Sequence, residues 1–301
     1  MKPWLKMLGQ AAKAWKEDNA FKHSAAVSFY TLFSLAPVTI IAVSVAGVFL
    51  GQDAASDQLE KQITQLIGPE SAQTVMAAAQ ASRGSHESPW ATAIGVGLVV
   101  FGATTVFGQL QESMNSIWGV RAKPSKRGWL VLLLHRLVSF AMVLTVAFLL
   151  LVSLVLTTLL TSVTGQLIGD SPGLLKVADL LGSLVVITLL FGLLFKVMPD
   201  VRLRWKEVWV GALLTAGLFT LGRYLIALYL GHSTVASIYG AAGSLVALLV
   251  WVYYSCAILF FGVEFVGVYR RHARLPIEPK EAAVLVREQI VTTRHGQLTK
   301  S

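Results

Sequence analysis

Two ionisable residues lie in or beside a long apolar stretch of this sequence, where charged side chains are rare. Arg223 is the only charged residue in positions 208–263, and Glu264 follows directly after that stretch. An ionisable group at membrane depth costs at least about 2.5–3.5 kcal/mol and usually faces a bundle interior or a wet cavity. We therefore take Arg223 as a candidate for binding an anionic headgroup or substrate, and Glu264 as a candidate for gating or for binding a coupling ion. The alternatives are that Arg223 extends to the outer headgroups and that Glu264 neutralises a nearby cytoplasmic base such as Arg136 or Lys196.

Polar and helix-bending residues occur at two further places in apolar stretches. Gln111 and Asn115 are four residues apart, so they share one face of a helix. Such groups either hydrogen-bond to a neighbouring helix as a structural contact or line the inner mouth of a cavity, and both readings stay open. Pro37 removes a backbone hydrogen bond and should kink its helix near Phe33, which makes it a candidate gating position.

The composition indicates that a membrane is the environment of these residues. The chain is 55% hydrophobic and only 14% charged, whereas soluble domains carry nearer a quarter charged residues. Its single cysteine, Cys256, excludes a disulfide within the chain and argues against a cysteine-based metal site. The net charge of +9 suits anionic lipid headgroups, and no nucleic-acid-binding motif accompanies it, so we expect membrane lipids rather than nucleic acid as partners.

The elements that carry the candidate residues are predicted to be transmembrane helices. About 20 apolar residues cross a hydrocarbon core of roughly 30 Å, and the apolar runs are continuous rather than alternating, which favours helices over barrel strands. The expected fold is an all-α integral membrane protein with six spans, at about residues 30–50, 90–111, 137–160, 180–198, 208–230 and 243–267. In this arrangement Arg223 and Glu264 differ in depth by roughly 15 Å, so they should not pair.

The distribution of Lys and Arg predicts the orientation. Twenty-one of these residues fall in the N-terminal segment, the second and fourth loops and the C-terminal tail, and only Lys61, Arg83 and Lys176 fall on the opposite side. The positive-inside rule places the basic side, and with it both termini, in the cytoplasm.

Three segments outside the spans are also expected to have structure. Residues 3–19 predict an amphipathic helix on the membrane surface, with Trp4, Leu8, Ala11 and Trp15 on one stripe and lysines opposite. Residues 51–88 predict a short extracytoplasmic helical hairpin. Residues 273–301 form a polar cytoplasmic tail, in which residues 281–290 could form a helical turn or two.

Motifs of familiar enzymes are not found. The six histidines are scattered without metal-ligand spacing, and there is neither a phosphate-binding glycine loop nor a nucleophile elbow. We expect no enzyme activity, no cofactor and no metal.

Four segments together resemble the YihY/BrkB family of bacterial inner-membrane proteins. They are AAVSFYTLFSLAP (25–37), GATTVFGQLQESMNSIWGV (102–120), KVMPDVRLRWKEVWVGA (196–212) and YGAAGSLVALLVWVYYSCAILFFGVEF (239–265). The resemblance implies a six-helix inner-membrane domain over residues 1–272. It carries over no catalytic residue, although members have been labelled ribonuclease BN, virulence factors or transporters. Tyr239, which opens the last segment, is added to the candidate cavity residues.

Two functions remain open at this stage. The first is a transporter or flippase-like protein that handles a lipidic or amphipathic component of the cell envelope. The alternative is a non-transporting membrane scaffold that docks an envelope-assembly complex. The sequence leaves the substrate, the energy source and the oligomeric state open.

Overall fold

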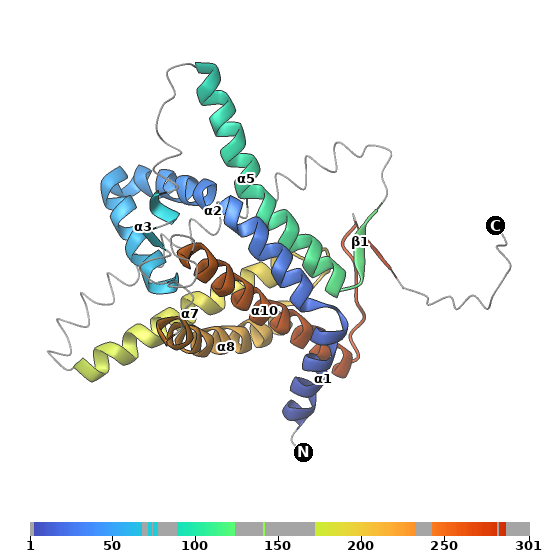
Figure 1. The fold of residues 1–301 in the computed structure, drawn as a ribbon. Coiled ribbons are helices and arrows are strands. Elements are labelled where there is room, and N and C mark those ends of the chain that lie inside the picture. The colour runs from blue at the N-terminus through green and yellow to red at the C-terminus, as the bar shows by residue number, and fades with distance from the viewer. Residues whose placement is uncertain are drawn as a thin grey trace.

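Seven long helices and two short strands make up the described part of the chain. The computed structural model describes residues 3–67, 72–73, 75–77, 89–123, 141, 172–232, 243–281 and 283–286 (Figure 1). The elements in chain order are α1 (Pro3–Glu17), α2 (Ala20–Leu50), α3 (Gln52–Ile67), α5 (Pro89–Ile117), β1 (Val120–Ala122), α7 (Pro172–Val197), α8 (Trp205–His232), α10 (Gly243–His272) and β2 (Ala283–Leu285).

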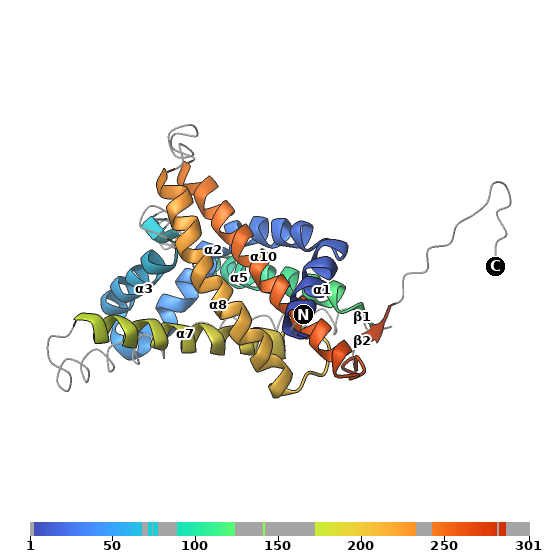
Figure 2. The same ribbon diagram turned by 90° about the horizontal axis from the view of Figure 1, so that it is seen from below.

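Helix α10 occupies the middle of the packing. It contacts α1, α2 and α8, while α5 packs on α2 and α7 packs on α8. Helices α8 and α10 run side by side (Figure 2). Their close approach depends on Gly262, because a Cβ at this position would lie only 2.9 Å from the Phe195 ring and closer still to Thr215 Oγ1. Ala212 and Ala216 are fully buried in the same core. Small residues are what lets helix backbones approach closely in a membrane.

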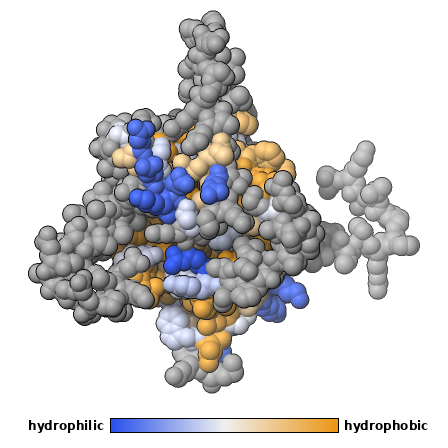
Figure 3. Space-filling view, turned by 60° about the vertical axis from the view of Figure 1, so that its left-hand side comes forward, coloured by the Kyte–Doolittle hydropathy of each residue, from blue (hydrophilic) through white to orange (hydrophobic). Residues whose placement is uncertain are grey.

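Apolar side chains also cover much of the outer surface of these helices. Three of the described helices contain a stretch long and apolar enough to cross a membrane, at Leu180–Val197, Trp205–Ile226 and Leu245–His272. Figure 3 shows apolar side chains reaching the surface of one face. The exposed apolar residues include Phe29, Phe33, Leu181, Leu213 and Leu225. A water-soluble monomer rarely exposes large contiguous apolar areas, so this surface fits a hydrocarbon environment.

The described helices cover five of the six predicted spans. Helices α2, α5, α7, α8 and α10 contain the spans expected near 30–50, 90–111, 180–198, 208–230 and 243–267, and most of them extend further. The span at 137–160 lies outside the described residues apart from Ala141. The number of six spans and the cytoplasmic location of both termini therefore stay predictions. Helix α3 is the expected first arm of the extracytoplasmic hairpin, and residues 72–73 and 75–77 of its second arm are helical.

Two expectations need correction at the C-terminal end. The fold is not entirely α-helical, because β1 pairs antiparallel with β2, with Arg121 opposite Val284. The helical turn expected in residues 281–290 is wrong at Ala283–Leu285, which is a strand, and residues 287–290 lie outside the described residues. The segment is short and contains the β-branched Val284, which suits a strand once a partner edge is present. Gly119 adopts a left-handed backbone angle, with φ of 61°, just before β1 and so turns the chain out of α5.

Helix α1 docks on α10 with its apolar stripe. Ala11 is fully buried against α10, and the Trp15 indole Nε1–H donates to the Ala257 carbonyl oxygen over 3.0 Å. Trp4 stacks on Phe265 with ring centroids 6.2 Å apart, yet half of its surface stays exposed. The predicted amphipathic helix is therefore present, and part of its apolar face meets protein. Its location at the membrane surface stays a prediction.

Candidate functional site

The turn between α7 and α8 makes partly buried polar contacts with two distant parts of the chain, α5 and the C-terminal tail. Pro199 ends α7, since proline cannot donate the next helical hydrogen bond, and Asp200 follows in the turn. Gln111 donates to one carboxylate oxygen of Asp200 over 3.3 Å, and Asn115 donates to the other over 2.8 Å. The Asp200 backbone N–H in turn donates to the Asn115 side-chain oxygen over 2.8 Å.

These contacts give both Gln111 and Asn115 a structural partner. Both side chains are buried and both bind Asp200, so they join α5 to the α7–α8 turn; their role in lining a cavity stays a prediction. Sequence reasoning placed the two amides on one face but missed Asp200. The available signal was its position, since an aspartate directly after a helix-ending proline is placed to accept hydrogen bonds from a neighbouring element.

The C-terminal tail closes over the same turn. Lys280 donates its backbone N–H to the Asp200 carbonyl over 2.8 Å and its ammonium to the Val197 carbonyl over 3.0 Å. The Arg202 backbone N–H donates to the Glu278 carbonyl over 2.8 Å. Burial lowers the pKa of the Lys280 ammonium from its ordinary value of 10.5, while the Asp200 carboxylate acts in the opposite direction.

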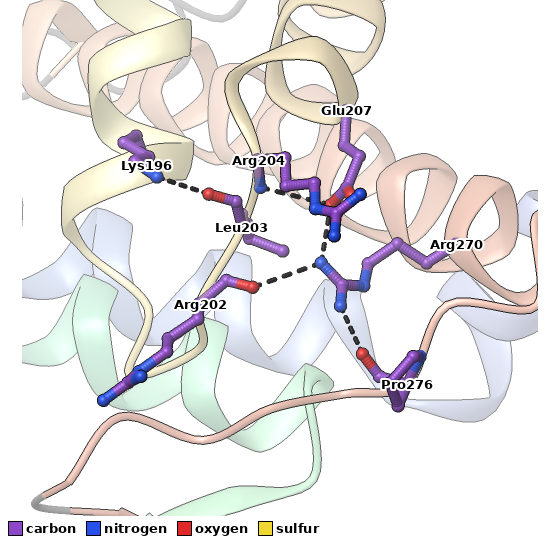
Figure 4. A network of polar contacts seen from close by, with 7 residues as sticks. All are labelled: Lys196, Arg202, Leu203, Arg204, Glu207, Arg270 and Pro276. Carbon is purple, nitrogen blue, oxygen red and sulfur yellow. Dashed lines mark hydrogen bonds and ion pairs between the residues drawn. The ribbon is translucent and has the colours of Figure 1, made fainter.

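A buried ion pair anchors the end of α10 beneath this tail. Arg270 Nη1 lies 2.5 Å from Glu207 Oε2, and both side chains are about 95% buried. Arg270 also donates to the carbonyl oxygens of Arg202 and Pro276 (Figure 4). Glu207 stands three residues after Arg204 and accepts its backbone N–H over 3.3 Å, which is half of a capping box at the start of α8. One carboxylate therefore caps α8 and holds α10.

Glu264 is a further buried ionisable residue, and, like Arg270 with its Nε, it has a buried side-chain atom without a hydrogen bond in the described part of the chain. Its side chain is 2% exposed in α10, and its Oε1 has no hydrogen-bond partner in the described part of the chain. The charged groups that act on it there are Asp18, between α1 and α2, and Arg271. Lys196, one example of a base that Glu264 could neutralise, instead donates to the Leu203 carbonyl and lies over the Trp205 ring. Arg136, the other expected base, lies outside the described residues.

The remaining candidates are not part of the polar contacts at the turn. Arg223 is half-buried on α8, with its guanidinium carbon 5.3 Å from the centre of the Tyr224 ring. It stands 18 residues after Trp205, so it is about 27 Å along α8 from the turn. Helix α2 continues past Pro37 from Ala20 to Leu50, and the predicted kink stays a prediction. Tyr239 lies outside the described residues.

No metal site emerges from the residues that the structure describes, since no three His, Cys, Asp or Glu side chains gather there in a suitable group.

Long apolar helices, held together at one end by the polar contacts of the α7–α8 turn and the C-terminal tail, define a helical membrane protein. The chain belongs to the family described as Virulence factor BrkB, whose model matches residues 11–284. Two of the segments that carry the resemblance, residues 102–120 and 196–212, are those that meet at Asp200.

The relatives are described as membrane proteins. The chain is 28% identical over 265 residues to a UPF0761 membrane protein of Saccharophagus degradans, covering 87% of this chain and 59% of the relative. It is 27% identical to a UPF0761 membrane protein of Nitrosospira multiformis, covering 82% and 56%. A UPF0761 membrane protein of Tolumonas auensis is 31% identical over 187 residues, covering 58% and 56%. The chain thus spans somewhat under two thirds of the length of these relatives. No solved structure matches it.

Proposed function

We propose that this protein is a transporter or flippase-like handler of a lipidic or amphipathic envelope component in the bacterial inner membrane, with both termini in the cytoplasm. The observation that carries the proposal is the buried carboxyl group of Glu264, inside one of the helices long enough to span a membrane. Charged groups buried without a full set of partners are expensive, and an intramembrane ionisable residue is by default a functional site.

Glu264 is suited to binding and releasing a coupling proton. Its neighbouring charges come from two different places, Asp18 at the junction of α1 and α2 and Arg271 on α10 itself. A proton gained or lost at Glu264 therefore changes the interaction between α10 and the α1–α2 junction. Helix α10 also contacts α2 and α8, so this change is transmitted to the centre of the bundle.

Arg223 is the proposed contact for the substrate. Its guanidinium is half-buried on α8 next to the exposed Tyr224, and arginine suits phosphate groups because its planar fork of donors forms paired hydrogen bonds. An amphipathic substrate with an anionic headgroup could bind there with its acyl chains against the apolar surface of α8.

Proteoliposomes test the proposal. The full chain is reconstituted with a fluorescent phospholipid, and transbilayer movement is measured by quenching, with and without an imposed pH gradient. We expect Glu264→Gln to abolish the dependence on the pH gradient and Arg223→Ala to slow movement about tenfold or more, which is the loss of one charge-assisted contact. Lys206→Gln, at an exposed cation on the same helix, serves as the control. Wild-type movement in both site variants would refute the assigned residues.

A scaffold that docks an envelope-assembly complex is the second candidate. The polar contacts around Asp200 favour it, because they hold the α7–α8 turn, β1 and the C-terminal tail as one fixed surface. Site-specific crosslinking from the exposed Arg121 and Glu281 tests this role. Recovery of lipid alone, with no protein partner, would count against it.

A further inference from the structure

A groove lies between α1 and the C-terminal end of α10. The two helices touch through Met7 and Ala11 of α1 and Phe265 and Val268 of α10. Beside this contact the groove has a volume of about 440 Å³ and is lined from both helices, by Gln10, Lys13, Ala14, Glu17, Arg271 and His272.

The groove carries charges of both signs. Lys13 and Arg271 are cations, and Glu17 is the one carboxylate among the residues that line the groove. Lys13 lies 3.7 Å from Glu17 with both side chains largely exposed, and such surface pairs hold together weakly. Both groups therefore remain available to a ligand. Arg270, the neighbour of Arg271, is instead engaged by Glu207.

The ends of the two helices decide which ligand fits. Helix α1 ends at Glu17 and α10 ends at His272, so both present the negative ends of their dipoles to this region. A lone anion would be attracted by Lys13 and Arg271 but repelled by Glu17 and by these helix ends. A ligand that carries its own cation beside an anion avoids the conflict.

The position of the groove indicates that such a ligand is the headgroup of a lipid. Trp4 and Leu5 of α1 expose about half of their surface, and an amphipathic helix with exposed Trp and Leu lies at the headgroup level. The long apolar helix α10 ends at His272, which lines the groove. We propose that this groove binds the headgroup of a phospholipid that carries both a phosphate and a primary ammonium.

In this complex Lys13 and Arg271 bind the phosphate, while Glu17 accepts hydrogen bonds from the ammonium. A trimethylated headgroup has no N–H to donate, and an anionic glycerol headgroup brings no cation to Glu17. The site is therefore selective for a primary amine. Its occupancy does not depend on transport, so the proposal stands apart from the function proposed above.

Native mass spectrometry of the full chain in detergent measures this preference. The probes are phosphatidylethanolamine, phosphatidylcholine and phosphatidylglycerol with identical acyl chains, and inorganic phosphate as a competitor. We expect phosphatidylethanolamine to bind about fivefold more tightly than either other lipid, which corresponds to one exposed charge contact. Millimolar phosphate should not displace it.

Three variants at exposed positions test the assigned contacts. Lys13→Gln and Arg271→Gln should each weaken phosphatidylethanolamine binding about fivefold, whereas Lys206→Gln should not. Glu17→Gln should weaken phosphatidylethanolamine and strengthen phosphatidylglycerol, reversing the preference, while thermal melting confirms the fold of each variant. Equal binding of the three lipids, displacement by phosphate, or insensitivity to Glu17→Gln would overturn the proposal.

Discussion

The buried pair of Glu207 and Arg270 offers a quantitative test of how the end of α10 is held. Removing one partner of a buried ion pair typically costs 3–5 kcal/mol, because the other charge stays buried. Arg270 would keep two carbonyl acceptors after Glu207→Ala, which places the charge effect near 3 kcal/mol. The same substitution removes the acceptor for the Arg204 backbone N–H, for about 0.5–1 kcal/mol more. We expect Glu207→Ala to lower the free energy of unfolding by about 3–4 kcal/mol.

A double-mutant cycle separates the ion pair from its surroundings. Arg270→Ala should cost about 3 kcal/mol, for the same reason. The double variant should lower the free energy of unfolding little more than either single variant does, because neither charge is then left buried without its partner. This corresponds to a coupling free energy of about 3 kcal/mol. The measurement is reversible unfolding in SDS from mixed micelles, followed by tryptophan fluorescence.

The control is a pair of the same type on the surface. Arg202 and Glu281 lie 3.3 Å apart with side chains 58% and 94% exposed, so Arg202→Gln should change the free energy of unfolding by less than about 1 kcal/mol. Two outcomes would refute the reasoning. One is that the decreases in the free energy of unfolding for Glu207→Ala and Arg270→Ala add up in the double variant. The other is that either single decrease is no larger than that of the Arg202→Gln control.

Three further predictions concern the turn and the helix packing. Asp200→Ala leaves the side chains of Gln111 and Asn115 without their acceptor and should cost about 2–3 kcal/mol by SDS unfolding, whereas a loss below about 1 kcal/mol would mean that water replaces the carboxylate. Gly262→Val should prevent the close approach of α8 and α10, so that no folded protein is recovered by gel filtration. The control is Gly217→Ala, which has open space around its Cβ position and should leave the stability unchanged or raise it. The lowered pKa of Lys280 means that the unfolded chain binds more protons between the folded value and 10.5. Stability should therefore rise with pH through that window. Lys280→Gln should flatten the rise, and an unchanged slope would contradict the assignment.

The elements were more predictable from the sequence than the contacts between them. Continuous apolar runs specify a helix by themselves, so α7, α8 and α10 begin and end within a few residues of expectation, apart from the earlier start of α7 at Pro172. Gln111 and Asn115 fall on one face through helix geometry alone. Their partner Asp200 is 85 or more residues away, and a local pattern cannot say which distant amide an aspartate will meet.

The same limit explains the errors. Lys196 is a plausible neighbour of Glu264 by its position at a helix end, but a lysine on a flexible stem reaches whichever acceptor is nearest, here the Leu203 carbonyl. The strand at Ala283–Leu285 depends on β1, more than 160 residues earlier, and three residues without that partner carry almost no signal. A local sequence pattern predicts how one segment folds, whereas tertiary packing determines which partners that segment meets.

The pairing of the C-terminal tail with β1 and the α7–α8 turn also orders the biogenesis of the protein. Residues 278–286 are translated after every described helix has been synthesised, so their contacts with β1 and the α7–α8 turn cannot form until all of these helices exist. Until then the Gly119 carbonyl oxygen and the Arg202 backbone N–H lack the partners that Val286 and Glu278 later provide. The completion of this end of the protein is thus a late, long-range step in its assembly.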